Sequence, residues 1–290
     1  MIAAALLVLQ AGTLTGEFQS PRVVESSGVA VSRAHPGILW THNDSGDGPY
    51  LYATDVQGRD LGALLVPGAG AIDWEDMALG PCPTHAGGGT CVYLADTGDN
   101  LEARPFVSVY AVAEPEPPTG PADTSRTTAA PATLKVVYPD GPHDVEAVYV
   151  SPRDTALYLV TKGRSGAIRL YRVDRARWAA GQTGFVVATL VQALPITPNR
   201  EAGRWVTGAS ISTDGGLVAV RTYTEIYLFT PRAGGQLVPA RDAGRPCDIA
   251  GLEAGGGEAI DFLTDSTLVL TTEAMGRRAG TIHTVTCKRS

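Results

Sequence analysis

A strand-turn-strand unit recurs five times along this sequence, and it restricts the fold more than any other feature. Each copy opens with a small or acidic residue and an apolar run, passes through a turn or loop, and returns as a second apolar run that ends in polar residues. The copies begin at Ser27, Asp73, His143, Thr207 and Glu258. Irregular repeats of four short strands are typical of β-propellers. The chain is therefore predicted to be an all-β propeller of four-stranded blades.

The fifth copy ends after its third strand, which is predicted from Thr281 to Thr286. A strand predicted from Phe18 to Val24 would supply the missing fourth strand, close the ring and leave no bare sheet edge. Five blades are predicted, and six remain an alternative because the segment from Pro195 to Arg204 could contain further strands. A short helix is predicted from Asp174 to Ala180.

Composition agrees with this fold and excludes some partners. The 34 Gly and 20 Pro residues suit many short strands joined by tight turns. The repeats place residues 18–290 in a single propeller domain, which we expect to be a monomer. A net charge of -7 and the lack of any Lys/Arg run argue against nucleic acid or an anionic membrane as a partner.

Residues 1–11 are predicted to be a signal segment. The apolar run from Ile2 to Leu9 is too short to span a bilayer but suits the core of an export signal. No Lys or Arg precedes it, so a buried hydrophobic first strand is the alternative. We expect a periplasmic or extracellular protein with no membrane span in the mature chain.

Four cysteines allow three pairings. Cys82 and Cys91 lie on the two arms of one loop, and Cys247 and Cys287 flank the last repeat, so these two pairs are predicted. Disulfides fit an oxidising compartment. Metal ligation by cysteine is the alternative, but the sequence has no C-x-x-C spacing to support it.

Polar residues recur at two places in each copy. In a propeller the first strand of a blade lines the central channel and the second runs back beside it, so residues entering the first and leaving the second share one face. The entering residues are Glu25, Glu75, Asp76, Asp144, Glu146, Thr207 and Glu258, and the leaving residues are Asn43, Asp44, Asp96, Asp99, Asn100, Lys162, Arg221 and Glu273. One mouth of the channel is therefore predicted to be strongly acidic.

Such a mouth suits a hard cation held by oxygen ligands, with Ca²⁺ as the best candidate. The predicted metal ligands are Glu25, Asn43, Asp44, Asp76, Asp96, Asp99, Asn100, Asp144 and Glu258. The alternative is that Asp and Asn are frequent here because they favour turns. The loop that starts at Asn43 is not an EF-hand, because Thr54 stands where a bidentate Glu is needed.

Three residues are candidates for catalysis. Glu75 and Glu146 could activate a water molecule, and His143 beside Asp144 could act as a general base. The alternative for His143 is a loop histidine that caps a strand. Candidate substrate-binding residues are Lys162, Arg221 and Glu273, and the two cations could instead neutralise neighbouring acids. The sequence has no G-x-S-x-G elbow, Walker loop, dinucleotide fingerprint or H-E-x-x-H motif.

Four motifs resemble an uncharacterised family of exported bacterial β-propellers over most of residues 25 to 275. They are WTHNDSG (40–46), DWED (73–76), YLADTGDN (93–100) and HDVEAVYV (143–150). More remotely, the chain is similar to SMP-30/gluconolactonase, NHL and esterase-like phytase propellers. That similarity implies a divalent metal at the channel mouth. Glu25, Asn43, Asn100 and Asp144 would correspond to the metal ligands of the lactonase group.

Two functions from different classes remain open. One is a metal-dependent hydrolase, in which Ca²⁺ polarises an ester or lactone carbonyl and a carboxylate activates water. The other is a non-catalytic exported scaffold that binds a protein, a glycan or a small molecule. A phytase is disfavoured because a phosphate-rich substrate needs more Lys and Arg than the two predicted at the mouth. The fold alone does not choose, because propellers serve many unrelated functions.

Overall fold

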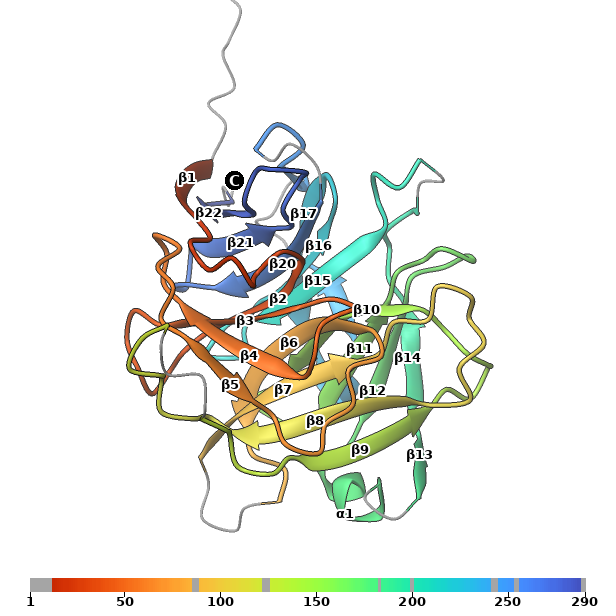
Figure 1. Cartoon of the computed structure of the whole chain (residues 1–290). Coiled ribbons are helices and arrows are strands. Elements are labelled where there is room, and N and C mark those ends of the chain that lie inside the picture. Colours follow the sequence, from red (N-terminus) through yellow and green to blue (C-terminus); the bar gives the residue numbers. More distant parts are fainter. Residues whose placement is uncertain are drawn as a thin grey trace, which may run out of the picture.

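The computed structural model describes residues 12–84, 89–121, 126–181, 184–198, 201–240, 245–252 and 256–287. Five antiparallel sheets surround a central axis and form a five-bladed β-propeller (Figure 1). The predicted fold class and blade number are confirmed. Six blades are excluded, because none of the described residues between 195 and 204 belongs to a strand. The predicted signal segment, residues 1–11, lies outside the described residues.

The first two blades follow the predicted repeats closely. Blade 1 consists of β2 (Ser26–Val31), β3 (Leu39–Asn43), β4 (Tyr50–Thr54) and β5 (Ala63–Leu65). Blade 2 consists of β6 (Trp74–Pro81), β7 (Thr90–Asp96), β8 (Val107–Ala113) and β9 (Ala132–Val137), and β13 (Phe185–Val187) pairs parallel to β9 as a fifth strand. Trp40 and Trp74 lie in the hydrophobic core between these two blades.

The other three blades complete the ring. Blade 3 consists of β10 (Val145–Val150), β11 (Leu157–Thr161), β12 (Arg169–Val173) and β14 (Thr189–Ala193). Blade 4 consists of β15 (Val206–Ile211), β16 (Val218–Thr222), β17 (Glu225–Pro231) and β18 (Leu237–Pro239), and β19 (Cys247–Asp248) pairs with β17. Blade 5 contains β20 (Gly257–Phe262), β21 (Leu268–Thr272) and β22 (Thr281–Val285). A 3-10 turn followed by α1 (Trp178–Gly181) confirms the predicted short helix.

The N-terminal part of the chain closes the ring, but with a different segment from the one predicted. The fourth strand of blade 5 is β1 (Gly12–Glu17), which pairs with β22 (Figure 1). The segment from Phe18 to Val24 forms no strand. Phe18 and Val23, the apolar residues that suggested a strand, are buried in the hydrophobic core between blades 5 and 1. Strand β1 is the outer strand of its blade and mostly solvent-facing, so it lacks an apolar pattern.

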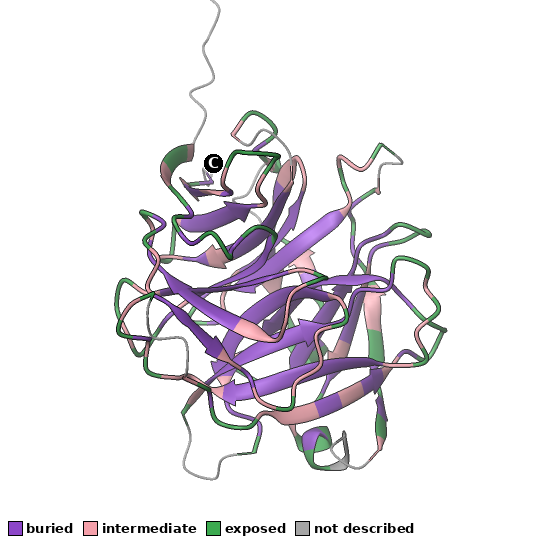
Figure 2. Ribbon diagram, in the orientation of Figure 1, coloured by how far each residue is buried: buried purple, intermediate pink, exposed green. Residues whose placement is uncertain are grey.

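The five innermost strands explain why the repeats begin with unbroken apolar runs. Strands β2, β6, β10, β15 and β20 are buried along almost their whole length, because each packs against two neighbouring inner strands as well as its own blade (Figure 2). Strands buried on both faces show continuous rather than alternating hydrophobicity. The outer strands are more exposed, and their patterns are weaker.

A β-bulge interrupts every inner strand near its start. The register shifts between Ser26 and Gly28, Trp74 and Asp76, Val145 and Ala147, Val206 and Gly208, and Gly257 and Ile260. A bulge inserts one residue that has no partner on the next strand and re-aims its side chain. In blades 2 and 3 the inserted residues are Glu75 and Glu146, and the bulge of blade 5 contains Glu258. The bulges therefore gather acidic side chains at one mouth of the channel.

Two disulfides join Cys82 to Cys91 and Cys247 to Cys287, as predicted. The first closes the loop between β6 and β7. The second ties β19 of blade 4 to the segment that follows β22 of blade 5. Within the described part of the chain, no helix has the length and apolar character needed to cross a membrane.

Candidate functional site

Five carboxylates from three blades meet where the inner strands begin and the second strands end. We call Asp44, Asp73, Glu75, Asp144 and Glu146 the mouth cluster. One oxygen each of Asp44, Asp73 and Glu75 lies within 4.8 Å of the other two. The same holds for Glu75, Asp144 and Glu146, so Glu75 belongs to both triads. Four of these residues were predicted at this mouth, and Asp73 of the DWED motif joins them.

The loop after β7 shapes the floor of the first triad. A Cβ atom on Gly98 would lie 2.0 Å from Glu75 Oε1 and 2.4 Å from Asp73 Oδ2. The Gly98 amide donates a hydrogen bond to the Asp73 carbonyl at 3.2 Å. Both carboxylates thus pack directly on the backbone of the loop. Only glycine leaves the two carboxylates this space. The glycine of the GDN sequence is therefore a local signal of the site, one that the predictions from the sequence did not include.

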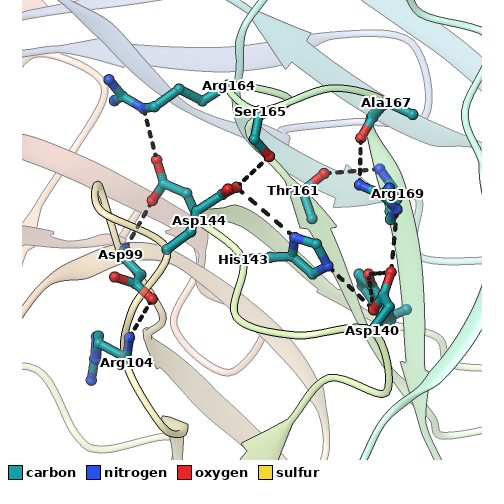
Figure 3. A network of polar contacts seen from close by, with 12 residues as sticks. Asp99, Arg104, Asp140, His143, Asp144, Thr161, Arg164, Ser165, Ala167 and Arg169 are labelled. Atoms are coloured by element: carbon teal, nitrogen blue, oxygen red, sulfur yellow. Dashed lines mark hydrogen bonds and ion pairs between the residues drawn. The ribbon is translucent and has the colours of Figure 1, made fainter.

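Cationic side chains contact the second triad. Lys162 Nζ lies 2.5 Å from Glu146 Oε1, and Arg164 Nε lies 3.3 Å from Asp144 Oδ2. The amide of Asp99 donates to Asp144 Oδ1 at 2.9 Å (Figure 3). In the second triad, Lys162 and Arg164 form salt bridges with Glu146 and Asp144. In the first triad, no described Lys, Arg or His forms a salt bridge with Asp44, Asp73 or Glu75. The first triad therefore gathers three carboxyl groups that have no salt-bridge partner among the described residues.

Burial shifts the proton affinity of the cluster upward. Burial raises the pKa of Glu146 to about 8, although the charge of Lys162 opposes this shift. Burial and the nearby Asp73 carboxylate raise the pKa of Asp44 to about 7. Burial, and after it the charge of Glu146, raise the pKa of Glu75 well above its ordinary value. Several of these groups consequently hold protons near neutral pH when no cation is bound.

Glu258 adds a further buried carboxylate at the same mouth. Its Oε1 accepts a hydrogen bond from the Tyr223 hydroxyl at 3.1 Å, whereas no described residue donates to Oε2. Burial raises the pKa of Glu258 well above its ordinary value, and the charges of Glu146 and Glu273 raise it further. An unsatisfied buried carboxylate oxygen is costly in a folded protein. Glu258 therefore has one oxygen available for a positively charged ligand.

Glu273 and Glu25 lie at the outer edge of the mouth. Glu273 is half-buried, and burial followed by the charge of Glu25 raises its pKa. Glu25 itself is exposed, and its carbonyl accepts the Asp44 amide at 2.9 Å. Neither residue belongs to the two triads.

Asn43 and Asp76 are occupied by hydrogen bonds to the backbone. Asn43 Oδ1 accepts the amides of Val24 and Glu25, and its Nδ2 donates to the Arg22 carbonyl and to Asp47. Asp76 is fully buried and accepts three backbone amides, from its own blade and from blades 3 and 4. The structure does not bring either of these predicted ligands into the mouth cluster.

Three other predicted ligands hold the loop beside the cluster. Asp96 Oδ1 lies 3.0 Å from Arg104 Nη2, and Asp99 Oδ2 accepts the Arg104 amide at 2.7 Å. Asn100 is exposed and accepts a hydrogen bond from Arg164 Nη2 at 2.6 Å. These contacts fix the loop that carries Gly98.

His143 points away from the mouth cluster. Its ring lies 3.2 Å from Asp140 Oδ1 and packs against Tyr138 and Tyr171. Figure 3 shows the ring directed toward Asp140, whereas the neighbouring Asp144 extends toward Asp99 and Arg164. The contacts of His143 agree with the alternative of a structural loop histidine.

Arg221 is completely buried and belongs to the wall of the channel. Its Nη1 donates to the carbonyls of Ala259 at 2.5 Å and Thr271 at 3.1 Å. The guanidinium thus joins blade 4 to the backbone of blade 5. Of the two predicted cations, Lys162 is the one that contacts the mouth cluster.

No family model matches this chain, and no curated protein matches it. It is similar to the PQQ-bound aldose sugar dehydrogenase of Streptomyces coelicolor, with 14% identity and a TM-score of 0.49 over 96% of this chain and 98% of that one. It is also similar to the Dos1 propeller, with 8% identity and a TM-score of 0.40 over 86% of this chain and 52% of that one. Neither similarity identifies the exported family that the motifs resemble.

Proposed function

We propose that this protein binds a divalent cation, preferentially Ca²⁺, at the acidic mouth of its channel. The observation that carries the proposal is the pair of carboxylate triads that share Glu75, together with the unpartnered oxygen of Glu258. Every donor in the mouth cluster is a carboxylate oxygen, the ligand type that hard cations prefer. A bound cation would replace the protons that burial otherwise places on these groups.

The first triad, Asp44, Asp73 and Glu75, is the better of the two positions. Lys162 and Arg164 already supply positive charge to the second triad, at 2.5 Å from Glu146 and 3.3 Å from Asp144. The first triad has half-buried members that open toward solvent, so water can complete the coordination. Ca²⁺ accepts six to eight oxygen ligands of mixed kind, about as many as three carboxylates and several waters provide.

Export is part of the same proposal. The two disulfides suit an oxidising compartment. Outside the cytosol, Ca²⁺ sites that bind at about 10⁻⁴ to 10⁻³ M are adequate, so a partly solvated site suffices.

A finer proposal is hydrolysis of an ester or lactone. When bound, Ca²⁺ supplies polarisation of the substrate carbonyl. Glu146 lies beside the proposed position, with an oxygen within 4.8 Å of Glu75, so its carboxylate can accept a proton from a water molecule there. Lys162 holds the Glu146 carboxylate in place. The non-catalytic scaffold is the second candidate, because a cation at the first triad would also join blade 1, through Asp44, to blade 2, through Asp73 and Glu75.

Calorimetric titration of EDTA-treated protein with Ca²⁺, Mg²⁺ and Mn²⁺ tests the cation site. We expect Ca²⁺ to bind, and D73N/E75Q to lose that binding. The matched control is E116Q, which removes an exposed carboxylate that contacts His35 and none of the mouth cluster. A chain that binds no ion, or a D73N/E75Q variant that binds Ca²⁺ as tightly as E116Q, would contradict the proposal.

Turnover separates the enzyme from the scaffold. The measurement is hydrolysis of p-nitrophenyl acetate and of a γ-lactone by protein loaded with Ca²⁺. The hydrolase proposal expects E146Q to keep Ca²⁺ binding and to lose turnover. A Ca²⁺-bound wild type without turnover on either substrate leaves the scaffold as the supported function.

A further inference from the structure

A pocket lies between blades 3 and 4, at the end of the inner strands opposite the mouth cluster. It encloses about 410 Å³ between the turn that joins β10 to β11, the end of β15 and the loop that joins β17 to β18. The mouth cluster is at the start of β10, whereas this pocket is lined by residues at its other end, such as Tyr149 and Ser151. Its size is in the range of small-molecule sites.

Tyr149, one of the residues that line the pocket, has a buried hydroxyl without a hydrogen-bond partner among the described residues. Tyr149 and Tyr158 stack with ring centroids 4.8 Å apart and an 8° angle between their planes. The Tyr158 hydroxyl donates to Asp154 Oδ2 at 2.7 Å. The Tyr149 side chain is only 2% exposed, and no described residue bonds to its hydroxyl. A buried hydroxyl normally has a hydrogen-bond partner, so this one suits an acceptor on a ligand.

Two arginines give the pocket positive charge. Arg153 and Arg232 line it, and neither forms a salt bridge within the parts of the chain that the structure describes. Arg153 Nε donates to the Asp214 carbonyl at 3.0 Å, which holds the side chain at the rim. The one carboxylate of the lining, Asp154, lies 3.4 Å from Arg172, which it shares with Asp174. Hydrogen bonds from Ser212 and Gly216, and after them the charge of Arg153, lower the pKa of the exposed Asp214 carboxyl. Arg232 forms no salt bridge among the described residues, and a guanidinium without a carboxylate partner favours an anionic ligand.

The floor of the pocket is glycine backbone and apolar side chains. Gly234 and Gly235 have φ angles of +72° and +83°, a conformation that side chains rarely adopt. A Cβ atom on Gly235 would lie 2.3 Å from the Tyr158 hydroxyl oxygen. Ile211 and Pro231 supply apolar surface beside these glycines. This composition, mostly apolar with a few placed polar groups, is usual for small-molecule sites.

We propose that this pocket binds a small organic anion. Its acid group lies between Arg153 and Arg232, its apolar body rests against Ile211 and Pro231, and an acceptor atom receives the Tyr149 hydroxyl hydrogen. The site is separate from the proposed cation site, since it lies at the opposite end of the strands and prefers the opposite charge.

Ligand-observed NMR titration with benzoate and with phenyl phosphate tests the proposal on the full chain, with benzyl alcohol as the uncharged probe. We expect at least one anion to bind with a dissociation constant below about 10 mM, and benzyl alcohol to bind about tenfold more weakly. R153Q/R232Q should weaken the anion about tenfold, whereas R277Q, an exposed arginine outside the pocket lining, should not. Failure of both anions to bind, or equal binding by R153Q/R232Q and R277Q, would overturn the proposal.

The Y149F variant tests the hydroxyl separately from the fold. Because the hydroxyl has no described partner, we expect Y149F to keep or raise the thermal midpoint of the ligand-free protein. It should weaken the anion about threefold to tenfold. Unchanged anion affinity in a folded Y149F would overturn the role of the hydroxyl. D73N/E75Q should leave anion binding intact, so failure of the cation site and failure of this pocket are distinguishable.

Discussion

Asp76 accepts the backbone amide of Val148 at 2.8 Å, although the two residues belong to different blades. The same oxygen accepts the amide of Ala209 at 3.1 Å, in a third blade. Asp261 of blade 5 likewise bonds to two other blades. It accepts the amide of Val31 in blade 1 at 2.6 Å and a hydrogen bond from the Ser210 hydroxyl in blade 4. Together, the carboxylates of Asp76 and Asp261 connect the inner strands of all five blades.

Replacing Asp76 is expected to destabilise the whole ring. D76A leaves three amides without their acceptor inside the channel, and we expect a loss of about 3 kcal/mol or more in the free energy of unfolding. D76N keeps one acceptor oxygen and should lose less. Urea unfolding of both variants measures the difference. A D76A variant as stable as wild type would show that these bonds contribute nothing.

The pH dependence of stability should be the reverse of that of an ordinary salt-bridged carboxylate. Burial raises the pKa of Asp44 to about 7 and that of Glu146 to about 8, above their unfolded values. The folded state therefore binds more protons, and the EDTA-treated protein should lose stability as pH rises from about 4 to about 8. Added Ca²⁺ replaces the protons, so its stabilising effect should grow over the same interval. Thermal unfolding at several pH values tests this, and a Ca²⁺ effect that is independent of pH would contradict it.

Gly98→Ala should weaken cation binding more than it weakens the fold. The new methyl group would lie 2.0 Å from Glu75 Oε1, so the carboxylates of the first triad must move apart. We expect the Ca²⁺ affinity measured by calorimetry to fall by about tenfold. Gly70→Ala is the matched control. Its methyl group would lie 3.0 Å from the Tyr110 hydroxyl and 3.5 Å, an ordinary van der Waals distance, from Asp96 Oδ2, and it touches no member of the mouth cluster. Equal affinities in the two variants would remove Gly98 from the site.

The two disulfides should differ in their effect on stability. The Cys247–Cys287 bond spans 40 positions and joins blade 4 to the end of blade 5, whereas Cys82–Cys91 spans nine. Longer loops lose more entropy when they are closed, so C247S/C287S should cost roughly 1 kcal/mol more than C82S/C91S. Urea unfolding of the two double variants checks the order. A larger loss in C82S/C91S would mean that strain, rather than loop closure, decides.

The sequence predicted the fold well and the site in part. Unbroken apolar runs identified the five inner strands, because residues buried on both faces leave little room for polar side chains. The sequence did not show in which direction the side chains of adjacent polar residues point. Glu75 and Asp76 are adjacent, but the bulge sends the first to the mouth and leaves the second bonded to other blades. His143 and Asp144 diverge in the same way (Figure 3). Contacts that depend on folding, such as that of Tyr223 with Glu258, left no local signal.

The pairing of β1 with β22 sets an order of events for the growing chain. The Thr15 hydroxyl donates a hydrogen bond to the Ile282 carbonyl, 267 positions later. Strand β1 therefore has no partner until β22 has been synthesised. Until then it offers an unpaired edge to other chains. A chain interrupted before β22 cannot complete the ring. Shortened products should therefore aggregate or be degraded rather than persist as a four-bladed protein.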